Sequence, residues 1–154
     1  MAKTLLIIAH RPSPNTAALA NAALAACQNY DDGKIETLCL TPFEVKSHDL
    51  LRADAVVIGT TENIGYMAGA TKDMFDRCYN DWLDRAEAKP VALYIRAGLD
   101  GTATSSALNS ICSGLKWRLV AEPLILKGDW DDQFTKDVAD LCLGVAAGLD
   151  IGIF

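Results

Sequence analysis

The stretch TLLIIAHRPSPNTAALANAALAA, residues 4–26, joins a short apolar run to an alanine-rich segment through a polar loop that contains two prolines. The apolar run, Thr4 to Ala9, is typical of a strand that is buried on both faces. The alanine-rich segment, residues 15–30, favours a helix. A buried strand that leads into a helix is the first half of a strand-helix-strand unit, and such units build parallel sheets.

The rest of the chain repeats this pattern. Apolar or alternating runs predict four more strands, at residues 34–40, 54–60, 90–98 and 118–126. Apolar stripes at helical spacing, with Ser47 and Asp131 as caps, predict four more helices, at residues 47–53, 71–88, 104–116 and 134–149. Pro123 suggests that the last strand lies at an edge. We therefore expect a three-layer α/β fold with a five-stranded parallel sheet in the order 2-1-3-4-5 and helices on both faces, formed by residues 1–154 as a single domain.

Composition excludes several function classes. The chain has 154 residues, of which 51% are hydrophobic and 22% are charged, and its net charge is −6. A negative surface repels nucleic acid and anionic lipid. No apolar run approaches the ~18 residues of a membrane helix, so we expect no membrane partner and a cytoplasmic protein. The five cysteines are widely spaced and lack any metal-binding pattern, which favours reduced core residues and predicts no metal site.

The expected strand order places a ligand beyond the carboxyl ends of strands 1 and 3. The loop after strand 1 combines a helix amino terminus with Arg11, Ser13, Asn15 and Thr16, and this set suits an anion such as a phosphate. Helix capping by Asn15 or Thr16, with the prolines stiffening the turn, explains the same residues without a ligand. Both interpretations stay open on this loop alone.

Two further loops point to a flat ring. The stretch ENIGYMAG, residues 62–69, is longer than a plain strand-to-helix turn, and its glycines allow close backbone approach. The alternative is an aromatic residue that packs on the next helix. The third loop, GLDG at residues 98–101, is by itself a common turn. The ring-binding candidates of these two loops are Glu62, Asn63, Ile64, Gly65, Tyr66, Met67, Gly98, Asp100 and Gly101.

Other ligand sites of this architecture lack their signatures. Neither G-x-x-x-x-G-K-[ST] nor G-x-G-x-x-G follows the first strand, which excludes a P-loop and a dinucleotide fingerprint. The first loop holds no cysteine nucleophile, and strand 3 ends in Gly59 and Thr60 where a phospho-acceptor domain carries an aspartate.

Taken together, AHRPSPNTAALANA, GTTENIGYMAGATKDMFDRCY and RAGLDGT resemble the flavodoxin-like flavoproteins, especially the short members grouped with NAD(P)H-dependent FMN and quinone reductases. The resemblance spans essentially the whole chain. It implies that the first loop holds the phosphate of FMN and that the other two hold its ring. Pro14 stands where flavodoxins usually have glycine, and Ala68 where related sequences often carry serine.

The resemblance implies an NAD(P)H-dependent oxidoreductase that reduces quinones, flavins or similar acceptors. A flavodoxin-type electron carrier that docks a protein partner is the alternative, and a flavin-free binding domain is a third possibility. No catalytic acid or base is identified. His10 is the only histidine near the site, and a structural role suits it as well as proton transfer does.

The helix expected at residues 71–88 carries Tyr79, Trp82 and Leu83 in addition to its core stripe. This is more apolar surface than one face against a sheet uses, so we expect a homodimer. Single exposed apolar residues are the alternative.

Overall fold

A seven-stranded sheet runs through the middle of the computed structural model, which describes residues 2–154. Its strands are β1 (Thr4–Ala9), β2 (Glu36–Leu40), β3 (Ala55–Asn63), β4 (Tyr66–Met67), β5 (Pro90–Ala97), β6 (Arg118–Leu119) and β7 (Leu124–Lys127). The main order is β2-β1-β3-β5-β6 and all of these pairs are parallel, as is the pair of β7 with β5. This confirms the predicted order 2-1-3-4-5. The short β4 is antiparallel to β3.

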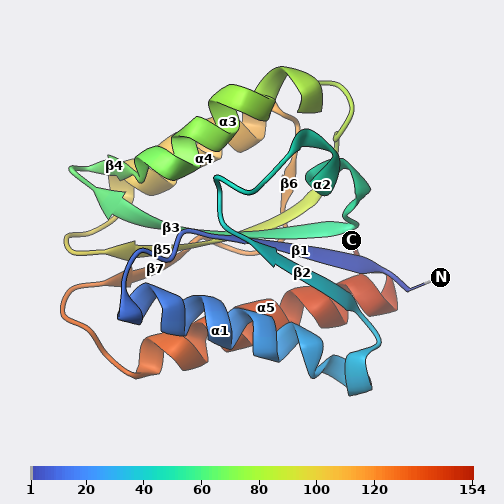
Figure 1. Ribbon diagram of the computed structural model, residues 1–154, viewed down its shortest axis with the longest axis horizontal. Helices are drawn as coiled ribbons and strands as arrows, with labels where there is room; N and C mark the ends of the chain where they lie inside the picture. The colour runs from blue at the N-terminus through green and yellow to red at the C-terminus, as the bar shows by residue number, and fades with distance from the viewer. Residues whose placement is uncertain (1) are drawn as a thin grey trace.

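Helices cover both faces of the sheet, which gives three layers. In Figure 1, α1 and α5 lie below the sheet, and α2, α3 and α4 lie above it. The helices are α1 (Pro14–Gln28), α2 (Ser47–Arg52), α3 (Gly69–Trp82), α4 (Thr102–Gly114) and α5 (Gln133–Ile151), with a short 3-10 turn, η1 (Tyr30–Gly33), after α1. Among residues 2–154, no helix combines the length and the apolar character that a membrane crossing requires.

The alternation of side chains along β1 explains why its sequence is apolar throughout. Leu6 and Ile8 point into the core shared with α2, α3 and α4, whereas Leu5 and Ile7 point into the core shared with α1 and α5. All four side chains are at most 1% exposed. A strand between two helical layers has no solvent face, so both sets of alternating positions must be apolar.

Three elements differ from the predicted ones by more than two residues at a boundary or by being divided. β3 continues to Asn63 and turns back into β4, so most of the second loop is a β-hairpin rather than a loop. α3 ends at Trp82, and Asp84 follows with φ 61°, which is outside the helical region. The last predicted strand is divided into β6 and β7, so the continuous strand is wrong. Pro123 lies between the two parts, and proline has no N–H to donate to a sheet ladder. The predicted edge position is confirmed, because β6 ends the main strand order and β7 pairs with β5.

The surplus apolar residues of α3 are used inside the chain. Trp82 is fully buried, and its indole N–H donates to the carbonyl of Ser47 at 2.9 Å. Tyr79 and Leu83 pack against the same core cluster. Tyr79 and Leu83 stay partly exposed, so the apolar surface that α3 leaves uncovered is smaller than expected.

A tyrosine ring replaces a side chain at the centre of the sheet. Gly59 of β3 is the register partner of Tyr94 of β5, and the Tyr94 ring lies over the glycine. A Cβ built on Gly59 would be 1.9 Å from Tyr94 Cζ, so no other residue fits at position 59 while the ring is there. The Tyr94 hydroxyl is buried without a hydrogen-bond partner among the described residues, and burial raises its pKa.

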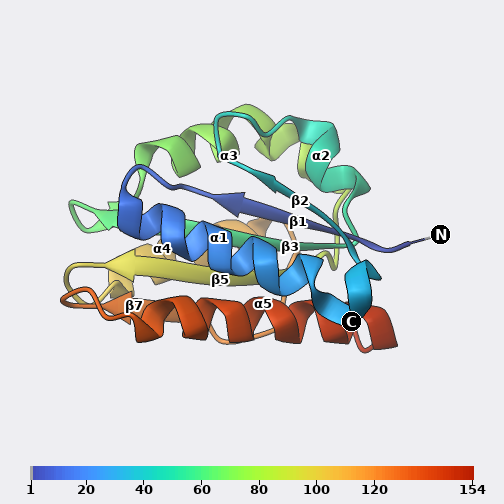
Figure 2. The same ribbon diagram turned by 60° about the horizontal axis from the view of Figure 1, so that its bottom comes forward.

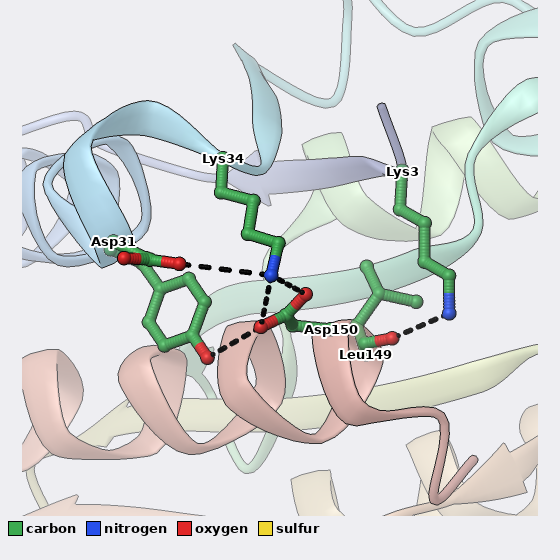
Figure 3. A network of polar contacts seen from close by, with 6 residues as sticks. Lys3, Asp31, Lys34, Leu149 and Asp150 are labelled. Atoms are coloured by element: carbon green, nitrogen blue, oxygen red, sulfur yellow. Dashed lines mark hydrogen bonds and ion pairs between the residues drawn. The ribbon is translucent and has the colours of Figure 1, made fainter. Parts of the chain in front are cut away.

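A polar network joins the end of α5 to residues that precede β1 and β2, at the amino-terminal ends of these strands (Figure 3). The Lys34 ammonium lies 2.9 Å from one carboxylate oxygen of Asp150, and the Tyr30 hydroxyl donates to the other at 3.0 Å. Lys3 donates to the carbonyl of Leu149 at 2.7 Å. These bonds hold α1, η1 and α5 together at the end remote from the candidate site.

Candidate functional site

Three loops meet at one edge of the sheet because three parallel strands end there. They follow β1, β3 and β5, which are neighbours in the sheet, and Figures 1 and 2 show all three at the same end of the molecule. The His10 N–H donates to the carbonyl of Gly59 at 2.9 Å, which fixes the start of the first loop to the middle of β3. This is the edge at which parallel α/β sheets bind their ligands.

The first loop is closed by a capping box. Ser13 is the N-cap of α1, and the Thr16 N–H donates to its hydroxyl at 3.2 Å. In return the Ser13 N–H donates to the Thr16 hydroxyl at 2.9 Å. A helix cap at Asn15 or Thr16 was predicted from sequence; the N-cap is instead Ser13, and Thr16 takes part in the capping box as the third residue of the helix.

The capping box leaves a reduced set of donors for an anion. Pro12 and Pro14 have no N–H, and the N–H groups of Ser13 and Thr16 are already bonded. Asn15 is exposed in the first turn of α1, and Arg11 is exposed in the loop before the helix. No acidic side chain lies in that first turn, and within residues 2–154 no carboxylate forms an ion pair with Arg11.

The second loop is a strained hairpin. Ile64 and Gly65 form its tip with φ angles of 51° and 72°, the pattern of a two-residue type I′ turn. Glycine adopts such angles freely, whereas a β-branched residue rarely does. The Ile64 side chain is 105% exposed, so no packing in the described chain compensates for the strain. Strain of this kind is concentrated at functional sites.

The other residues of the hairpin divide between the core and the surface. Met67 is only 2% exposed and packs in the core under α3 and α4, so its side chain is not available to a ligand, contrary to expectation. Tyr66 is 40% exposed and faces out. The Asn63 amide oxygen accepts a hydrogen bond from the Thr61 hydroxyl at 2.8 Å, which leaves its NH₂ group free to donate.

The third loop is bound to the second by Glu62. One carboxylate oxygen of Glu62 accepts the Leu99 N–H at 3.0 Å, and the other accepts the Gly101 N–H at 2.9 Å. Gly101 has φ 68° and is the N-cap of α4. Asp100 accepts the Thr102 N–H at 3.0 Å, and this bond holds the pKa of its carboxyl below the usual range. Gly98 is exposed before the turn.

The three helix amino termini at this edge differ in charge. α4 has two carboxylates at its first turn, those of Glu62 and Asp100. α3 begins after Ala68 without any side-chain cap and has no acidic side chain in its first turn. α1 is capped by neutral hydroxyls with Arg11 close by. Because a helix amino terminus carries partial positive charge, a phosphate is favoured at α1 and disfavoured at α4.

Sequence reasoning missed one exposed residue of the site, Leu99. It lies between Gly98 and Asp100 and is 76% exposed, so an apolar side chain projects from the third loop as Ile64 does from the second. A large apolar residue inside a glycine- and aspartate-containing turn was the available signal. Burial lowers the pKa of His10, which favours its neutral form.

Two surface grooves lie outside the three loops. One, of about 640 Å³, runs along the polar face of α4 past Ser105, Ser106 and Asn109, and no charged side chain lines it. The other, of about 360 Å³, lies at the start of β1 and β2, remote from the ligand edge. Glu36, Asp49 and Arg52 line the second groove. The three-loop edge remains the candidate site because parallel α/β sheets bind their ligands at the carboxyl ends of their strands.

Comparison with known proteins supports the fold. The chain matches a flavodoxin from the domain Archaea with a TM-score of 0.77 at 14% identity, covering 97% of this chain and 99% of that one. It matches an oxidoreductase from Corynebacterium diphtheriae with a TM-score of 0.68 at 18% identity over 95% and 96% of the two chains. A WrbA-like flavodoxin from Agrobacterium tumefaciens gives 0.73 at 12% identity over 97% and 98%. No protein-family model matches the sequence, and a search of curated proteins found no match. The fold is flavodoxin-like.

Proposed function

We propose that the three-loop edge binds FMN and that the protein is an NAD(P)H-dependent oxidoreductase that reduces a quinone, a flavin or a similar small acceptor. The observation that carries the proposal is the contrast between two helix amino termini at this edge. The terminus of α1 has neutral hydroxyl caps and Arg11, whereas that of α4 has Glu62 and Asp100. A ligand with an anionic end and a neutral ring fits this polarity.

The first loop offers few hydrogen-bond donors to the phosphate of FMN, but those present fit it. We assign the phosphate to Arg11 and to the first turn of α1, where Asn15 supplies an open N–H and amide and the exposed Ser13 hydroxyl adds a donor. Thr16, which was expected to join this set, is buried, and its hydroxyl donates to the Ser13 carbonyl at 3.1 Å. Pro14, which stands where the resemblance leads us to expect glycine, removes one backbone N–H from this set. The charge of Arg11 compensates for the smaller number of donors.

The side of the site that would hold the ring exposes apolar side chains. Ile64, Tyr66 and Leu99 are exposed at the two outer loops and offer apolar surface to a flat ring. Gly65 is at the tip of the hairpin and outside its ladder, so its N–H is free of strand pairing, whereas Tyr66 is paired with Asn63. These residues bind and orient the ring and exclude water from one face.

The redox chemistry belongs to FMN, which when bound accepts electrons from a nicotinamide and passes them on singly or in pairs. The chain adds no evident acid or base, because His10, whose neutral form is favoured, is the only histidine near the edge. Its contribution is positioning and charge. Glu62 and Asp100 place negative charge beside the ring loops, which disfavours additional negative charge on a bound ring.

A titration tests the cofactor. FMN added to the flavin-free protein should lose its fluorescence on binding, and no quenching at high micromolar FMN would refute the proposal.

Arg11→Gln should weaken the binding of FMN about tenfold, since a charge-assisted bond to phosphate is lost, and should leave the binding of riboflavin unchanged. Arg85→Gln, at an exposed arginine beyond α3, is the matched control and should alter neither. Equal losses of FMN and riboflavin in Arg11→Gln would place the phosphate elsewhere.

An electron carrier that docks a protein partner is the second candidate function. The net charge of −6 and the exposed Ile64 and Leu99 beside the site favour it. Rapid mixing of the FMN-loaded protein with NADH and with NADPH separates the two. Fast bleaching supports the reductase, and no bleaching with either nucleotide supports the carrier.

A homodimer and a cytoplasmic location remain predictions. Trp82 is buried and Tyr79 and Leu83 pack in part against the core, so α3 offers less apolar surface to a second copy than the sequence suggested. Light scattering that reports a mass near 16.5 kDa at high concentration would refute the dimer. The five free cysteines support a reducing compartment such as the cytoplasm.

A further inference from the structure

We propose that Glu62 is a positioning residue that ties the second loop to the third and so sets the spacing of the ring site. The inference rests on the proposed FMN site for its functional consequence, but the contact itself does not depend on a ligand. Glu62 was expected to touch the ring from the second loop. Its carboxylate instead makes two hydrogen bonds to the third loop.

The backbone of Glu62 is held in place by contacts that do not involve its side chain. Glu62 is the register partner of Met67 in the β3–β4 hairpin, and the Met67 side chain is 2% exposed in the core. The Ala68 N–H also donates to the carbonyl of Thr61 at 3.1 Å. The carboxylate therefore extends from a rigid base, and the third loop is the partner that is held in place.

Both oxygens of the carboxylate are used, each by a different backbone donor. Leu99 donates at 3.0 Å and Gly101 at 2.9 Å. Gly101 is the N-cap of α4, so its N–H lies at the positive end of the helix, where a carboxylate is stabilised. A Cβ at Gly101 would be 2.8 Å from the Ile125 side chain, which shows how closely this backbone is packed against β7.

The two N–H groups are consequently unavailable to a ring carbonyl. Gly98, Asp100 and Gly101 were expected to contact the ring. The N–H groups of Leu99 and Gly101 are instead bonded to a carboxylate, which is a stronger acceptor than a neutral carbonyl. Glu62 thus does not serve as a ring ligand. It holds Leu99 and the start of α4 at a fixed distance from the hairpin, so that the gap is formed before a ring enters it.

Amide hydrogen exchange in the flavin-free protein tests the contact directly. The Leu99 and Gly101 amides should exchange at least about tenfold faster in Glu62→Gln than in the wild type, because one acceptor oxygen is replaced by NH₂ and the charge is lost. The Ile58 amide, in the middle of β3, should not change. Asp100→Asn removes the same charge from the same loops but only a local bond to Thr102, and should leave the Leu99 and Gly101 rates unchanged. Unchanged rates in Glu62→Gln would overturn the proposal.

Flavin affinity tests the role. Glu62→Gln should weaken the binding of FMN and of riboflavin by the same factor, about tenfold, because the contact of Glu62 with the third loop lies on the ring side and not at the phosphate. Glu62→Asp keeps the charge but is too short to bond both donors, so it should resemble Glu62→Gln; wild-type affinity in Glu62→Asp would overturn the role of reach. Faster exchange with wild-type affinity for both flavins would overturn the role in binding. If the wild type binds neither flavin, the proposed function fails, while the exchange experiment still decides whether Glu62 joins the loops.

Discussion

Replacement of Ile64 by asparagine should raise the stability of the flavin-free protein. Ile64 has φ 51° at the tip of the hairpin, and the left-handed region costs an L-residue about 1–2 kcal/mol. Asparagine adopts this region several-fold more often and is the preferred first residue of a type I′ turn before glycine, here Gly65. The Ile64 side chain is 105% exposed, so no buried apolar area is lost.

The expected gain is about 1 kcal/mol, which corresponds to an increase in Tm of about 2–4 °C for a chain of this size. Thermal unfolding followed by circular dichroism measures it, with denaturant unfolding as a second method. Ile64→Val keeps the β-branch and the strain, so its Tm should match that of the wild type. A Tm of Ile64→Asn equal to or below the wild-type value would refute the assignment of strain to this residue.

The same variant separates strain from function. If the exposed Ile64 side chain contacts a flavin ring, Ile64→Asn should bind FMN more weakly although its flavin-free form is more stable. Such a trade between stability and binding is the usual reason for a strained residue to be kept. Unchanged FMN affinity would assign the apolar contact to Tyr66 or Leu99 instead.

Two further predictions concern the fold. Gly59→Ala should destabilise the protein by about 2 kcal/mol or more, because its Cβ would be 1.9 Å from Tyr94 Cζ, and the double variant Gly59→Ala/Tyr94→Leu should recover part of that loss; equal stability of both variants in urea would contradict the packing. The hydrogen bond from Lys34 holds the pKa of Asp150 below its usual range, so this carboxylate stabilises the fold above its unfolded-state pKa and the contribution is lost as the pH falls through its lower folded-state pKa. The difference in Tm between wild type and Asp150→Asn should therefore narrow as the pH is lowered from about 6 to about 3, and a constant difference would show that the charge of Asp150 is not the cause.

Sequence patterns predict the layers and the strand order well because burial on both faces of a parallel sheet leaves a continuous apolar signal, as in β1. The hairpin after β3 was missed because ENIGYM carries no Asn-Gly or Asp-Gly turn. Isoleucine occupies the position where the turn type favours asparagine, so the local signal contradicts the structure formed.

Sequence patterns indicated which loops lie together at this end of the sheet but not the hydrogen bonds between them. Arg11, Asn15 and the tip of the hairpin lie where the loop pattern suggested, whereas Met67 packs in the core and Glu62 bonds to Leu99 and Gly101. Leu99 and Gly101 lie 37 and 39 positions after Glu62 in the sequence. No local pattern indicates which acceptor two loop N–H groups will find at that separation, since it depends on how neighbouring strand ends are aligned in the sheet.

The ring of Tyr94 above Gly59 also restricts how sequences with this sheet can diverge. A mutation that adds a side chain at position 59 is harmful while the ring is present, whereas a smaller residue at position 94 leaves a cavity but no clash. An evolutionary path between the two arrangements must therefore change position 94 first and position 59 second. Homologues with alanine or a larger residue at position 59 are expected to have lost the aromatic ring at position 94, so the two positions should covary although they are 35 residues apart in the numbering of the chain.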